Sequence, residues 1–141
     1  MFVFPLFVWF VAQLFKASIH VIRGKPFRFA LLWASGGMPS SHSAFMTSVT
    51  TVIALEEGVG SMLFLLAFAI TCVVLHDAVV VRRQVGIHAE ILNGEIKHNK
   101  ASEWKMLPVA IGHTIPEMVG GSLFGILLTY LFWSIWEMGI L

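Results

Sequence analysis

The chain has 141 residues, of which 57% are hydrophobic, 13% aromatic and only 12% charged. An average soluble domain carries roughly 25% charged residues, so this composition excludes a disordered chain and disfavours an ordinary soluble domain. The net charge of +1 gives no indication of a nucleic-acid partner. The single cysteine, Cys72, excludes an intrachain disulfide and a cysteine-based zinc site.

Apolar stretches in the chain predict about four transmembrane helices, because a helix needs about 20 residues to cross the membrane. These stretches cover residues 2–22, about 40–57, 61–81 and 118–136. The second is the least apolar and carries the hydroxyl residues Thr47, Ser48, Thr50 and Thr51. We expect these hydroxyls to face other helices rather than lipid.

Two further segments complete the expected fold. Residues 27–35 are apolar but too short to span, so we interpret them as a re-entrant or interfacial segment. Residues 83–112 are polar enough to lie outside the membrane, and they carry an apolar stripe at helical spacing made of Ile87, Ile91, Leu92 and Ile96. The sequence therefore predicts an all-α, polytopic membrane helical bundle, with an amphipathic loop helix, as a single integral-membrane domain over residues 1–141.

Threading four spans places every Lys and Arg at or near one face of the membrane. The opposite face holds only the acidic residues Glu56, Glu57 and Glu137. Positive charge in short loops marks the cytoplasmic side, which predicts a cytoplasmic basic face with both termini on the opposite face. A site that binds a polyanion would gather the same charges for its own reasons.

The first motif covers residues 36–44 and lies on the basic face. Its glycines permit a tight approach, and Ser40 and Ser41 are good caps for the helix that follows. The unpaired amides and the positive end of the helix dipole favour an anion, to which His42 can donate a proton. The alternative is a capped helix start whose histidine only hydrogen-bonds a loop.

The second motif covers residues 76–83. Asp77 lies within a span, where an ionisable group usually has a partner or a function. Arg82 and Arg83 can hold phosphate oxygens, or they can be end-of-helix charges that reach the lipid head groups. On a continuous helix Asp77 and Arg82 are about 140° apart, whereas His76 and Arg83 share a face. Both pairs can face one pocket only if the helix ends or distorts near Val81.

The third motif covers residues 112–117. Thr114 and Glu117 have the spacing of a capping box, which is the structural interpretation of Glu117. His113 has no role in starting a helix, and Glu117 is near enough to orient its ring. Too few further ligands have recognisable spacing for a metal site, so we expect none.

Taken in order, and with the Leu92-Asn93 pair, these motifs resemble the divergent branch of the type 2 phosphatidic acid phosphatase family, over about residues 36–125. The resemblance implies metal-independent catalysis, with His113 as the nucleophile, His42 as the proton donor and Glu117 orienting His113. It also implies a phosphate pocket that we assign to Arg82, Arg83, Ser40, Ser41 and Lys25. Asp77 is either a further site residue or the partner of one of the arginines.

The resemblance implies an integral-membrane phosphatase that hydrolyses a lipid or prenyl phosphate or diphosphate through a phosphohistidine, without a cofactor. The alternative is a membrane protein that binds a phospholipid head group or phosphate without turnover, because the family's serine-arginine pair before the nucleophile is absent. The wider superfamily has a six-helix core, so four spans imply a reduced core or a second subunit. Gly121 and Gly125 form a small-residue pair that suits either contact, including a homodimer.

Overall fold

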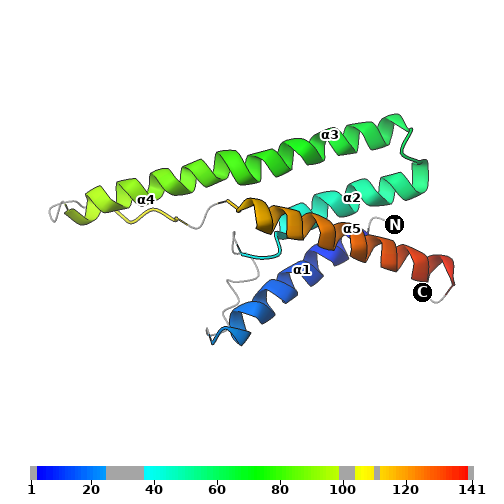
Figure 1. Cartoon of the computed structure of the whole chain (residues 1–141), viewed down its shortest axis with the longest axis horizontal. Helices are drawn as coiled ribbons and strands as arrows, with labels where there is room; N and C mark the ends of the chain where they lie inside the picture. The colour runs from blue at the N-terminus through cyan, green and yellow to red at the C-terminus, as the bar shows by residue number, and fades with distance from the viewer. Residues whose placement is uncertain (1–2, 25–36, 99–103, 110–111, 140–141) are drawn as a thin grey trace.

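The computed structural model describes residues 3–24, 37–98, 104–109 and 112–139, and its regular elements in these ranges are all helical. They are α1 (Val3–Ile22), α2 (Ser41–Glu57), α3 (Met62–His76), a π-helical turn η2 (Asp77–Val81), α4 (Arg82–His98) and α5 (Ile115–Glu137). Figure 1 shows the chain reversing direction from α1 to α2, from α2 to α3, and again before α5. The predicted helical membrane bundle is confirmed. The expected re-entrant segment and Lys25 lie outside the described residues.

Helix α2 is the centre of the bundle, because α1, α3 and α5 all pack against it. Its hydroxyls join it to two of these neighbours. Thr129 on α5 donates a hydrogen bond of 2.6 Å to Ser48, and the hydroxyls of Thr50 and Thr71 lie 2.8 Å apart between α2 and α3. The prediction that these hydroxyls face other helices is therefore confirmed for Ser48 and Thr50.

Small residues bring α5 against the backbone of α2. A Cβ on Gly121 would collide with the carbonyl oxygen of Ser40, and a Cβ on Gly125 would collide with the carbonyl oxygen of Ala44 and the hydroxyl of Thr47. This pair of glycines therefore makes a contact within one chain. Of the two contacts that the sequence left open for this pair, the structure shows the one within the chain, and nothing in its described residues supports the homodimer.

Three of the described helical runs are long and apolar enough to cross a membrane: α1, the continuous run from α3 through α4, and α5. Helix α2, which was expected to be a further span of the same kind, has 17 residues and lies at the short end of the spanning range. It tolerates its many hydroxyls because they hydrogen-bond either to carbonyl oxygens of α2 itself, as Thr51 does, or to the neighbouring helices, as Ser48 and Thr50 do.

The helix of the third span does not end at Val81 but continues through a π turn into α4, which is the amphipathic helix expected outside the membrane. Residues 62–98 form one helical run of 37 residues, drawn as a nearly straight rod in Figure 1. A π turn absorbs the irregularity instead of ending the helix. At 1.5 Å per residue the run is about 55 Å long, so α4 extends well beyond a hydrocarbon core of about 30 Å. Ile87, Ile91 and Leu92 of the predicted stripe are exposed on it.

The close contact between α5 and α2 predicts that Gly125→Ala destabilises the protein. The added methyl group must displace the backbone at Ala44, and overpacking of this kind costs about 1–3 kcal/mol. Thermal unfolding of the detergent-purified protein measures the effect. Gly94→Ala is the matched control, since its Cβ meets nothing within 4 Å and alanine favours a helix. Equal melting temperatures for the two variants would contradict the packing described above.

Candidate functional site

The π turn places Asp77 and Arg82 on the same side of the helix. The backbone N–H of Arg82 donates to the carbonyl oxygen of Asp77, five residues earlier, rather than to the residue four positions before it. The widened turn lets the Arg82 Nε donate to the Asp77 Oδ2 at 2.6 Å. The distortion near Val81 that a common pocket requires is therefore present.

The segment that carries His113 is attached to this turn through its backbone. The His113 N–H donates to the carbonyl oxygen of Ala78 at 3.0 Å. Gly112 has a φ of +97°, and a Cβ there would lie 2.6 Å from the backbone nitrogen of Arg83. Only glycine combines this left-handed conformation with so close an approach. The π turn and Gly112 together fix where His113 lies.

Asn93 on α4 binds the segment around Leu107, which precedes His113 in the chain. Its Nδ2 donates to the carbonyl oxygen of Leu107 at 2.9 Å, and the Leu107 N–H donates to the Asn93 Oδ1 at 2.7 Å. The side chain is buried, and it pairs with this segment as a second backbone strand would. This contact gives a structural reason for the asparagine of the Leu92-Asn93 pair.

Glu117 completes the predicted capping box and also lies near the ring of His113. Its Oε2 accepts a hydrogen bond of 2.9 Å from the N–H of Thr114, and the Thr114 hydroxyl accepts one of 3.4 Å from the N–H of Glu117, which completes the capping box. The same Oε2 lies 3.5 Å from the Nδ1 of His113. That distance is too long for a good hydrogen bond, and the Nδ1 makes none within the described residues, so the attraction is electrostatic.

His113 is buried, with 6% of its surface exposed, and this burial is the main reason why its pKa is lowered. The Glu117 carboxylate acts in the opposite direction and raises the pKa, while His42 and Lys16 lower it. Burial disfavours the charged imidazolium, so the ring is neutral near pH 7. A neutral imidazole retains the lone pair that a nucleophile needs.

Helix α2 presents one exposed side chain of its motif to this region. Ser40 is fully buried, accepts hydrogen bonds from the N–H and the hydroxyl of Ser43, and donates its own N–H to the carbonyl oxygen of Glu117 at 3.2 Å. Ser41 is also buried. His42 is exposed, and Arg82 and Lys16 lie within electrostatic range of it. The serines thus build the helix start, and His42 is the group available to a ligand.

Lys16 is the basic residue near the site that the motifs did not reveal. It lies on α1, and its Cδ would be 3.3 Å from a Cβ on Gly37, just before α2. Its charge acts on both histidines. One signal was available in the sequence: Lys16 follows a charge-free stretch over residues 1–15 and lies inside a predicted transmembrane helix. A charged residue inside such a helix usually has a function.

The two arginines have different surroundings. Arg83 lines a cleft of about 170 Å³ together with Glu90, His113 and Glu117. Arg82 pairs with Asp77 and acts on His42 instead. The described residues thus gather all the predicted site side chains except Lys25 around the starts of α2 and α5 and the π turn. Lys25 belongs to the part of the chain that is not described.

The fold and this cluster define a helical membrane protein with a histidine- and cation-rich site at one end of its bundle. The model of the divergent PAP2 family matches residues 1–128, and the chain belongs to that family. A relative from Bacillus subtilis (strain 168), described as the uncharacterized membrane protein YuiD, is 34% identical over 132 residues, with 84% of each chain covered. No solved structure matches the chain. The resemblance inferred from the motifs is therefore confirmed.

The position of Glu117 predicts a direction for the titration of His113. In Glu117→Gln the amide oxygen still accepts the Thr114 hydrogen bond, but the negative charge that raises the pKa of His113 is lost. We expect the pKa of His113 to fall further, measured by NMR titration of its ring protons. The control is Glu90→Gln. Glu90 lines the same cleft, but its carboxylate is not among the groups that shift the pKa of His113. An unchanged or higher pKa in Glu117→Gln would contradict this geometry.

Proposed function

We propose that this protein is an integral-membrane, metal-independent phosphatase that hydrolyses a lipid or prenyl phosphate or diphosphate through a phosphohistidine. One observation carries the proposal: a buried histidine, His113, is held by its backbone beside the carboxylate of Glu117 and within electrostatic range of His42 and Lys16. Binding an anion alone requires amides and cations. A neutral histidine beside a carboxylate is the arrangement of an oriented nucleophile.

The arrangement supports a two-step reaction. The Glu117 carboxylate favours the tautomer with the proton on Nδ1, so the Nε2 of His113 attacks phosphorus and the bond to the leaving oxygen breaks. His42, in its imidazolium form, donates a proton to that oxygen and becomes neutral. Water then attacks the phosphohistidine, with His42 as the base, and releases phosphate and free His113. Arg83 and Lys16 stabilise the charge on the phosphoryl oxygens, which is the main source of catalysis in phosphoryl transfer.

The position of the site favours an amphiphilic substrate. The site lies where α2 and α5 begin, at the end of the bundle, so a phosphate held there leaves its hydrocarbon chain beside apolar helices (Figure 1). The two helix N-termini add their positive dipole ends to the surrounding cations. A phosphate or diphosphate on a lipid or prenyl alcohol suits both parts of this environment.

The second candidate is a protein that binds a phospholipid head group or phosphate without turnover. The observation that favours it is the 2.6 Å ion pair between Arg82 and Asp77, because this carboxylate neutralises one of the two arginines near the histidines. Stabilising the transition state of phosphoryl transfer requires more positive charge than binding a singly charged head group does. A site with fewer available cations therefore suits binding better than turnover.

Phosphate release by the purified protein from a panel of lipid and prenyl phosphates, in the presence of EDTA, distinguishes these candidates. We expect turnover that falls at least about 100-fold in His113→Ala and in His42→Ala, since each removes a group that acts on the reacting atoms. His88→Ala is the control, because His88 is an exposed histidine on α4. If no substrate releases phosphate, while inorganic phosphate still raises the melting temperature of the protein, the phosphatase proposal is wrong and the binding proposal takes its place.

We further propose that the site faces the cytoplasm, with both termini on the opposite side. The described Lys and Arg residues lie where α1 ends and α2 and α5 begin, or further out along α4 and its loop, as the positive-inside rule requires. A C-terminal alkaline phosphatase fusion in a bacterial inner membrane is then active, whereas a C-terminal green fluorescent protein fusion is dark. The reverse pattern would place the site outside.

A further inference from the structure

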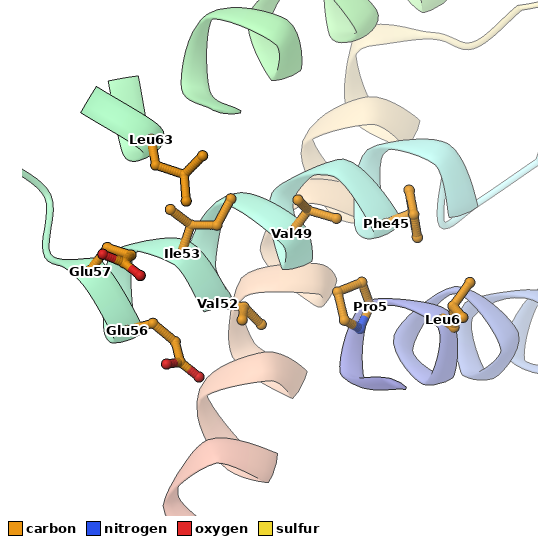
Figure 2. Close-up of a pocket in the computed structure, with 9 residues that line it drawn as sticks. All are labelled: Pro5, Leu6, Phe45, Val49, Val52, Ile53, Glu56, Glu57 and Leu63. Carbon is orange, nitrogen blue, oxygen red and sulfur yellow. The ribbon is translucent and has the colours of Figure 1, made fainter. Parts of the chain in front are cut away.

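A second cavity runs along α2 to the end of that helix that is remote from the histidines. It is a groove of about 740 Å³ between the start of α1, the length of α2 and the start of α3, and Figure 2 shows side chains from all three helices around it. Its apolar walls include Leu6, Val49, Ile53 and Leu63. The volume is in the range of about 300–1,000 Å³ that small-molecule sites occupy.

Two carboxylates complete the lining at the end of α2. Glu56 and Glu57 are the last residues of that helix, and both are exposed. Negative charge is unfavourable there, because a helix C-terminus already carries the negative end of the dipole. Neither residue takes part in an ion pair within the described part of the chain. The groove thus combines an apolar interior with an uncompensated negative mouth.

The basic residues in the described part of the chain are remote from this mouth. Helix α2 has 17 residues and is about 25 Å long, and the described Lys and Arg side chains lie at its other end or beyond. A second copy inserted in the same direction would carry its basic residues at that other end too. Charge complementarity therefore points to an amphiphile that carries an ammonium group rather than to a copy of this chain.

We propose that the groove binds an acyl chain of an aminophospholipid whose primary ammonium group lies over Glu56 and Glu57. The chain removes apolar surface from the groove, and the ammonium group donates charge-assisted hydrogen bonds to the carboxylates. A quaternary choline head group has no N–H to donate, and a glycerol head group brings no positive charge. The site lies in the leaflet opposite the histidines, so it is distinct from the proposed phosphatase site.

Native mass spectrometry of the delipidated full-length protein tests this proposal, with phosphatidylethanolamine, phosphatidylcholine and phosphatidylglycerol of matched acyl chains as probes. We expect phosphatidylethanolamine to be retained about tenfold more than phosphatidylglycerol, as one charge-assisted hydrogen bond allows. The double variant Glu56→Gln/Glu57→Gln removes this preference, whereas Glu137→Gln, a carboxylate at the end of α5, retains it. Ile53→Trp fills the groove and reduces retention of all three lipids.

Three outcomes would overturn the proposal. The first is equal retention of the three lipids by the natural protein. The second is a phosphatidylethanolamine preference that survives in the double variant. The third is that the natural protein forms a dimer that retains no lipid and that dissociates into monomers in Ile53→Trp. This result would assign the groove to a second copy of the chain. Circular dichroism and the melting temperature of each variant show that a lost preference is not a loss of folding, and none of these results depends on phosphatase activity.

Discussion

The close contact between α2 and α5 determines where the candidate site lies. Gly121 and Gly125 let the two helix backbones touch, and the N–H of Ser40 donates to the carbonyl oxygen of Glu117 at the point where both helices begin. Two helix N-termini are thereby brought together, with His42 on one and His113 just before the other. Without this contact the histidines would belong to separate ends of independent helices. The hydroxyl pair of Ser48 and Thr129 continues the same contact further along the two helices.

The π turn adds the third part of the site. A regular α-helix would direct Asp77 and Arg82 to different faces, and it would leave no irregularity against which the segment before α5 could dock. The wider turn pairs these two residues and contacts His113 through the carbonyl oxygen of Ala78. π turns inside long helices are often found at functional sites, since they store a local distortion in an otherwise stable element. The turn thus joins the α3–α4 run to the start of α5.

Local signals in the sequence predicted the helix starts well. Ser40 and Thr114 each cap a helix, as the sequence predicted. The continuity of α3 and α4 was not predicted, because adjacent arginines after an apolar run look the same at the end of a span and in the middle of a longer helix. Lys16 was missed as a neighbour of the histidines for another reason. Its proximity arises from tertiary packing of α1 on α2, which no spacing within a motif expresses.

The two ends of the bundle differ in charge, and this difference organises what each end can bind. One end gathers the cations and helix N-termini, both of which attract a phosphate. The other combines the C-terminus of α2 with Glu56 and Glu57, which attract an amine and disfavour a head group with a net negative charge. We therefore expect an anionic lipid at the first end and an aminophospholipid at the second, without competition between them. In the two proposals made above, the charge asymmetry that orients the protein in the membrane also assigns a different kind of head group to each end.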